Sequence, residues 1–266
     1  MTVKAPRRVL MIGNSFCYYF LDELWGMADA VGIDCRFSGV IAGAATLQQH
    51  WMWHENGEKP YDLRTADANG ITQKHGLSLI DCLCEDNWDV ISYQDGEHYY
   101  RTEGAASARD HMEPYLGNLV RLGRERFPDA AHLFHAVWAY QIGYAREGLA
   151  FRVDSEEIQQ TMQQDLNNMA DLACRDHALR RVPTGDAWAL ARADARIGDT
   201  LCMPDCLHDG EEGGQYLNAC VWFEVLFGQS CIGNPFRPSY ALSEERIAAL
   251  QECAHTAVSD ASHTKQ

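Results

Sequence analysis

Several features are scarce in this chain of 266 residues, and each shortage narrows the function. Basic residues are few: 22 Lys and Arg stand against 38 Asp and Glu, so the formal net charge is −16. No basic run interrupts this balance, which argues against nucleic acid or an anionic membrane as a partner. No apolar stretch has the length of a membrane-spanning helix, and residues 9–12 are too short for a signal peptide. We therefore expect a cytoplasmic protein that binds neither nucleic acid nor membrane.

Motifs for nucleotide cofactors and for zinc are also missing. The chain contains neither G-x-G-x-x-G nor G-x-x-x-x-G-K-[ST], so dinucleotide and phosphate-loop functions have no support. Ten cysteines are present, but Cys82 and Cys84 are too close in sequence for a zinc knuckle. Most of the others stand alone in apolar stretches, which is typical of buried free thiols in a reducing compartment. We expect no cofactor and no metal.

The chain does contain an alternation of short apolar runs with amphipathic patterns. Such alternation predicts βαβ units, in which a parallel sheet carries helices on both faces. The expected strands are residues 9–12, 37–41, 90–93 and 133–137, with a weaker candidate at 181–182. The expected helices are residues 18–30, 78–84, 107–126, 156–177 and 213–227. Without a repeat or a linker, we expect one α/β domain over residues 1–266, with a C-terminal helix at about 243–258.

Two segments break this alternation. Residues 54–74 are rich in Asn, Gly, Asp and Thr, and residues 96–106 form a second polar stretch. Loops of this length are often functional, so we expect both segments to be loops near the site.

The most informative residues follow the first apolar run. Residues 9–12 end in Gly13-Asn14-Ser15-Phe16, which predicts a buried strand that ends in a turn. A serine in this place stands at the carboxyl edge of a parallel sheet, where ligands bind in open α/β folds. The pattern after it predicts a helix whose positive N-terminal end would stabilise negative charge at the serine. The alternative interpretation is that Asn14 or Ser15 simply caps that helix.

A base for this serine is available in the segment Asp205-Cys206-Leu207-His208. Serine is a poor nucleophile unless a base takes its proton, and the base needs an orienting carboxylate. A three-residue offset in a loop lets Asp205 reach Nδ1 of His208 while Nε2 faces Ser15. The order Ser…Asp…His also occurs in α/β-hydrolases, but their G-x-S-x-G elbow is missing here. The alternative is an Asp/His pair that forms a surface salt bridge or lies at a helix N-terminus.

Ile12-Gly13-Asn14-Ser15-Phe16 and Asp205-x-x-His208 resemble the first and last blocks of the SGNH (GDSL-like) hydrolases. The sequence is most similar to one bacterial subgroup, the DUF4886 family. Between the two blocks, the similar segments follow in the same order. They are residues 42–51, 88–94, 138–141 and 214–219. The resemblance spans residues 8–228 and implies a flavodoxin-like three-layer α/β/α fold that hydrolyses esters.

The resemblance also implies roles for individual residues. It makes Ser15 the nucleophile, His208 the general base and then acid, and Asp205 the carboxylate that orients His208. The oxyanion hole would combine the N–H groups of Ser15 and Gly43 with a third donor. The asparagine motif of the wider superfamily, G-x-N-D, is absent from the third block, and Gln94 stands near its place.

Polar and aromatic residues near the expected sheet edge favour a small ester as substrate. The candidate substrate-binding residues are Asn14, His50, Tyr93, Trp138 and Gln141. The same aromatic group also includes Trp51, Trp53, Tyr99, Tyr100 and Tyr140. Aromatic rings can stack on sugar rings, so we expect small O-acyl esters, acetyl esters above all, on a carbohydrate or another small molecule.

Other interpretations stay open. His50 and His54 are four residues apart, which would place both on one helix face, so a metal-dependent hydrolase is one alternative. A non-catalytic ligand-binding domain on the same scaffold is another, because fold does not determine function. Acyl transfer to a sugar would use the same three residues as hydrolysis. The apolar residues 221–223 could bury against the sheet or against a second copy, which leaves a homo-oligomer open.

Overall fold

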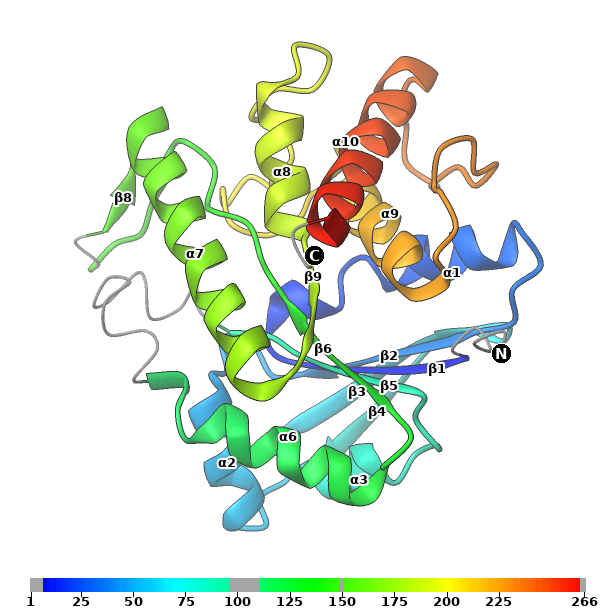
Figure 1. Cartoon of the computed structure of the whole chain (residues 1–266), viewed down its shortest axis with the longest axis vertical. Coiled ribbons are helices and arrows are strands. Elements are labelled where there is room, and N and C mark those ends of the chain that lie inside the picture. Colours follow the sequence, from blue (N-terminus) through cyan, green and yellow to red (C-terminus); the bar gives the residue numbers. More distant parts are fainter. Residues whose placement is uncertain (1–6, 96–110, 149–150, 264–266) are drawn as a thin grey trace.

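The computed structural model describes residues 7–95, 111–148 and 151–263, and a seven-stranded sheet lies at its centre (Figure 1). The strand order is β4-β3-β2-β1-β5-β6-β9. Five neighbouring strands are parallel: β2 (Arg36–Ile41), β1 (Arg8–Ile12), β5 (Val90–Tyr93), β6 (Ala131–His135) and β9 (Arg180–Val182). The segments expected to be strands therefore form the parallel part of the sheet.

Helices cover both faces of the sheet (Figure 1). One face carries α2 (Leu47–Glu55), α3 (Leu79–Leu83) and α6 (Tyr115–Arg126). The other carries α1 (Leu21–Asp29), α7 (Glu156–His177), α8 (Thr184–Ala193), α9 (Gly214–Phe227) and α10 (Glu244–His263). This confirms the three-layer α/β/α arrangement. Helices α2 and α8 have no counterpart among the helices expected from the sequence.

The largest correction concerns residues 54–74, which we expected to be a loop. Helix α2 extends to Glu55, and β3 (Tyr61–Asp67) and β4 (Gly70–Leu77) form an antiparallel hairpin at the edge of the sheet. The dipeptide Asn69-Gly70 lies at its turn, where Gly70 adopts a φ of +88°. Asn-Gly is a strong hairpin signal, so the sequence contained the evidence for these two strands. The second expected loop, residues 96–106 with Tyr99 and Tyr100, lies outside the described residues.

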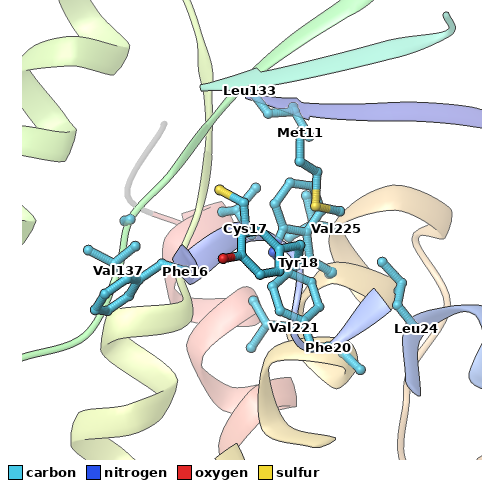
Figure 2. Packing of buried hydrophobic residues seen from close by; sticks show 14 of the residues in the cluster. Met11, Phe16, Cys17, Tyr18, Phe20, Leu24, Leu133, Val137, Val221 and Val225 are labelled. Carbon is cyan, nitrogen blue, oxygen red and sulfur yellow. The ribbon is translucent and has the colours of Figure 1, made fainter. Parts of the chain in front are cut away.

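The core between the sheet and the helices α1, α7, α8, α9 and α10 depends on β1 and α9, which are buried on all sides and mostly apolar. Residues 9–12 of β1 are buried on both faces, as expected of a central parallel strand. Figure 2 shows Val221 and Val225 of α9 among Met11 of β1 and Leu24 of α1. Each buried side chain of this size stabilises the fold by about 1.5–3 kcal/mol. The apolar residues 221–223 are thus buried inside this chain.

Smaller features complete the fold. β7 (Tyr144–Ala145) and β8 (Arg152–Val153) form a separate two-stranded antiparallel sheet. The ten cysteines form no disulfide in the structure, and most of them are buried. Across the three described ranges, no helix has the length and apolar character needed to cross a membrane.

Candidate active site

Ser15 lies in a tight turn at the carboxyl end of β1. We call residues 13–15 the Ser15 turn. Strand β1 lies between β2 and β5, where the strand order reverses, and this is the usual ligand-binding place in open α/β sheets. Ser15 begins a single 3₁₀ turn, Ser15–Cys17, ahead of α1, and the side chain of Asn14 accepts the N–H of Phe16 at 3.1 Å. Asn14 therefore has the capping role left open by the sequence, while the Ser15 hydroxyl has another partner.

Buried hydrogen bonds hold the Ser15 turn from inside the protein. The carbonyl oxygen of Gly13 lies 2.8 Å from Nε2 of His50, and the hydroxyl of Tyr61 lies 2.9 Å from Nδ1. A carbonyl can only accept, so Nε2 carries the proton and Nδ1 accepts from Tyr61. The N–H of Asn14 donates to Oε1 of Gln94 at 3.0 Å. His50 and Gln94 are both fully buried, and burial lowers the pKa of His50 to about 4.

The three side chains of the expected triad form one continuous chain of contacts. Oγ of Ser15 lies 2.7 Å from Nε2 of His208, and Nδ1 of His208 lies 2.6 Å from Oδ2 of Asp205. The other Asp205 oxygen accepts the N–H groups of Leu207 and His208. Partial burial raises the pKa of Asp205, but the hydrogen bonds from His208 and Leu207 outweigh this effect and hold that pKa below its ordinary value. An ionised carboxylate on Nδ1 leaves Nε2 free to accept a proton from Ser15.

The loop that carries His208 is anchored at several points. The indole N–H of Trp138 donates to the carbonyl of Leu207 at 3.0 Å, and the N–H of Gln141 donates to the carbonyl of Cys206 at 2.9 Å. Cys206 has a φ of +60°, which is uncommon for a residue with a side chain. These contacts hold a strained turn in place and fix the direction of the His208 ring.

A pocket of about 280 Å³ opens beside Ser15. Its polar lining includes Asn14, Ser15 and His208, and the loop after β2 contributes Gly43 and Ala44. The remaining lining residues are Phe16, Tyr18, Tyr19, Tyr140, Arg146 and Leu207. The pocket is therefore a small, largely aromatic site with the Ser15–His208 pair on its wall.

The structure places five other expected site residues away from this pocket. Gln94 and His50 support the Ser15 turn from inside, as described above. Tyr93 points to the opposite side of the sheet, where its hydroxyl donates to the carbonyl of Leu119 at 3.3 Å. Trp138 and Gln141 brace the His208 loop, and neither lines the pocket. Polar residues near a strand end share one edge of the sheet, but their side chains can point away from the ligand.

Tyr140 belongs to the aromatic group that we expected near the site, and it lines the pocket. Tyr18, Tyr19 and Arg146 also line the pocket, but the sequence did not indicate them as binding residues. Tyr18 and Tyr19 fit equally well into the pattern of a helix that packs in the core. Arg146 lies in a short hairpin far from Ser15 in sequence, and no local pattern indicates its position. Only the packing of the chain brings it to the pocket.

The geometry gives little support to a metal site at His50 and His54. Both ring nitrogens of His50 are within hydrogen-bond distance of protein atoms, while His54 is half-buried beside the ring of Trp51 at 5.2 Å. Among the residues that the structure describes, no group of three or more His, Cys, Asp or Glu side chains could hold a metal ion.

Behind the triad lies a buried carboxyl group that the sequence analysis did not anticipate. Asp209 follows His208 directly and is fully buried; its Oδ2 accepts from Nδ2 of Asn218 at 3.1 Å. Its Oδ1 has no hydrogen-bond partner in the described part of the chain. Burial raises the pKa of Asp209 to about 8, and burial also raises the pKa of nearby Glu23 to about 7.

Comparisons with known proteins agree with this fold. Residues 8–257 match the family described as a domain of unknown function, DUF4886. A DUF4886 family protein from Bacteroides uniformis has a crystal structure with 25% identity and a TM-score of 0.82, covering 95% of this chain and 94% of that one. No curated protein matches the sequence.

More distant solved structures share the fold alone. An acetyl xylan esterase, AlAXEase, has 11% identity and a TM-score of 0.53 over 83% of this chain and 100% of its own. A candidate GDSL-like lipase from Parabacteroides merdae has 16% identity and a TM-score of 0.52 over 85% of this chain and 97% of its own.

Proposed function

The chain belongs to the DUF4886 family and has the SGNH hydrolase fold, and on this basis we propose that it is a serine esterase with Ser15 as its nucleophile. The observation that carries the proposal is the chain of contacts from Ser15 through His208 to Asp205, at 2.7 and 2.6 Å. A buried structural serine has no need of a histidine that is itself oriented by a carboxylate.

In the proposed reaction, Oγ of Ser15 attacks the ester carbonyl while Nε2 of His208 takes its proton. The resulting oxyanion accepts hydrogen bonds from the N–H groups of Ser15 and Gly43, which belong to the pocket wall. His208 then gives the proton to the leaving alcohol, and an acyl group remains on Ser15. Water repeats the sequence on the acyl-enzyme and releases the acid. We assign Gln94 to the support of the turn instead of to the oxyanion hole, because its side-chain oxygen accepts from Asn14.

The pocket favours a small acyl group. Its volume of about 280 Å³ lies at the lower end of ordinary ligand pockets, which argues against a long lipid chain. Of the tyrosines that line it, Tyr19 is half-buried and offers a ring against which a sugar can pack, while Tyr18 and Tyr140 are buried behind the wall. We therefore propose short O-acyl esters, acetyl esters first, on a carbohydrate or a similar polar alcohol.

Labelling with a fluorophosphonate tests the nucleophile directly. We expect labelling of the wild-type chain, and its loss in Ser15→Ala with an unchanged thermal midpoint. Ser239→Ala removes an exposed serine outside the pocket and should label as wild type. Labelling of Ser15→Ala at the wild-type rate would contradict the proposal. Folded wild-type protein that neither labels nor cleaves nitrophenyl acetate would favour the ligand-binding alternative.

A further inference from the structure

The pocket contains a single positive side chain that the proposed reaction does not use. Arg146 is the one Lys or Arg among the residues that line it. Within the described residues Arg146 forms no hydrogen bond and no ion pair. By contrast, Arg192 is paired with Asp199 at 2.8 Å and Arg196 with Asp194 at 2.6 Å. A guanidinium in a pocket with no protein partner is available to a ligand.

The backbone around Arg146 is tied to the loop that carries His208. Ala145, the residue before Arg146, pairs with Arg152 in the β7–β8 hairpin. The hairpin is held by the N–H of Gly143, which donates to the carbonyl of Val153 at 2.8 Å. At its base, Gln141 donates to the carbonyl of Cys206 in the triad loop at 2.9 Å. The hairpin therefore places the backbone next to Arg146 at one side of the pocket, from which the exposed side chain of Arg146 reaches the lining.

Aromatic packing strengthens this placement. The rings of Tyr140 and Tyr144 lie 4.4 Å apart, and the ring of Phe151 lies 6.4 Å from each of them. Tyr140 also lines the pocket, so the same cluster that supports the hairpin shapes the wall next to Arg146. In Figure 1, β8 lies on the left of the molecule, the side toward which β1 runs.

The strongly negative charge of the whole chain makes Arg146 an indication of the charge of the substrate. With a formal net charge of −16, the protein repels anions on average, and the carboxylate of Asp205 lies within the triad itself. A neutral ester needs no cation in its binding site. A substrate with a carboxylate would need one to offset this repulsion, and a guanidinium can bind a carboxylate through two parallel hydrogen bonds.

We propose that Arg146 makes this site selective for esters that carry a carboxylate close to the scissile bond. The carboxylate can belong to the acyl part, as in a succinyl ester, or to the alcohol part, as in an O-acetyl uronic acid. This proposal rests on the esterase function proposed above and adds its substrate class. It assigns Arg146 to specificity and leaves the chemistry to Ser15, His208 and Asp205.

The test compares matched charged and neutral esters on four proteins. The acyl-side pair is nitrophenyl succinate and its methyl ester, and the alcohol-side pair is O-acetyl methyl galacturonide and O-acetyl methyl galactoside. The proteins are the wild type, Arg146→Ala, Arg146→Lys and Arg152→Ala. Arg152 is an exposed arginine of the same hairpin that does not line the pocket, so its loss is a matched control for charge.

We expect Arg146→Ala to lower kcat/KM for the charged member of one pair about five- to twentyfold and for neutral esters less than twofold. Arg152→Ala should change neither value by more than about twofold. Arg146→Lys should recover part of the loss, because a point charge replaces the planar fork. The pair of esters whose charged member loses kcat/KM in Arg146→Ala identifies the part of the substrate that carries the carboxylate. An unchanged ratio of charged to neutral activity in Arg146→Ala would overturn the selectivity proposal while the esterase function stands.

Protection from fluorophosphonate gives a readout that does not depend on turnover. Succinate and galacturonate should slow the labelling of Ser15 in the wild type more than in Arg146→Ala, and added salt should weaken this protection. Equal protection in both proteins would contradict the role of Arg146. If the wild type neither labels nor hydrolyses any ester, the proposed function itself fails, and the selectivity proposal fails with it.

Discussion

The two sides of the Ser15 turn have opposite characters. The pocket side presents Ser15 to His208 across 2.7 Å, next to the exposed glycine of the Gly43 loop. On the buried side, His50 and Gln94 are fully enclosed, and each accounts for one backbone group of the turn. One short turn therefore has two roles: the hydrogen bonds on its buried side stabilise the fold, and its pocket side carries the groups proposed for chemistry.

Substitutions on the two sides should therefore impair the protein in different ways. A change on the pocket side should remove activity from a protein that still folds. A change on the buried side should lower the free energy of unfolding and lower activity only as a consequence.

The largest effect is expected from Asp205→Asn on the pocket side. The asparagine can keep the oxygen that accepts from Leu207 and His208, but it presents an NH₂ group to Nδ1 of His208. Nδ1 must then accept, Nε2 carries the proton, and the ring can no longer take the proton of Ser15. We expect kcat to fall about 1,000- to 10,000-fold, with the free energy of unfolding changed by about 1 kcal/mol or less. Steady-state kinetics and urea unfolding measure the two quantities. A large loss of unfolding free energy in Asp205→Asn would contradict the proposed difference between the two sides of the turn.

A pair of glycine substitutions compares the two sides directly. A Cβ on Gly13 would lie 2.5 Å from Oε1 of Gln94 and 2.7 Å from Sγ of Cys17, so Gly13→Ala should destabilise the fold by about 1–3 kcal/mol. A Cβ on Gly43 meets nothing within 4 Å, so Gly43→Ala should leave the free energy of unfolding within about 0.5 kcal/mol. Its methyl group stands at the pocket and should lower kcat/KM less than tenfold. Equal unfolding free energies for the two variants would show that the buried side is not tightly packed.

The smallest effect is expected in the pH dependence of stability. Burial raises the pKa of Asp209 to about 8, so the folded chain keeps a proton that the unfolded chain releases above about pH 4. Stability should therefore fall as pH rises from about 4 to about 8. Asp209→Asn has no proton to lose, so its stability relative to the wild type should increase as pH rises from about 4 to about 8, with the gap closing near pH 4. Urea unfolding at several pH values measures this gap.

Asp34→Asn removes an exposed carboxylate and is the matched control for that experiment. We expect its stability to follow the wild type across the same pH range. A gap of equal size in Asp34→Asn would attribute the effect to net charge instead of to the burial of Asp209.

Much of the architecture could be predicted because it depends on local patterns. The four buried residues of β1 and the alternation after them indicate parallel strands and helices without any long-range information. Asn69-Gly70 was a local signal for the β3–β4 hairpin, but the polar composition of residues 54–74 led us to expect a loop. The weak strand candidate at residues 181–182 is β9, but helix α8, which begins at Thr184 directly after it, was not expected from the sequence.

The direction of side chains could not be predicted in the same way. His50 and Gln94 were expected at the ligand, yet both point inward, because each satisfies a buried backbone group of the Ser15 turn. Tyr93 was expected there too, but its hydroxyl bonds to the carbonyl of Leu119 in α6. The type of a residue and its position near a strand end indicate which edge of the sheet the residue occupies. They do not indicate whether its polar atoms are needed by the protein or by a substrate.

By itself, the sequence determined the sheet edge at which Ser15 lies and the loop that contains Asp205 and His208, because turns and apolar periods are local. Only the tertiary structure decided that His208 meets Ser15 at 2.7 Å across 193 residues. It also brought Arg146 to the same pocket. Packing and the need to pair buried polar groups act between segments that are distant in sequence. These interactions determine the direction in which each side chain points.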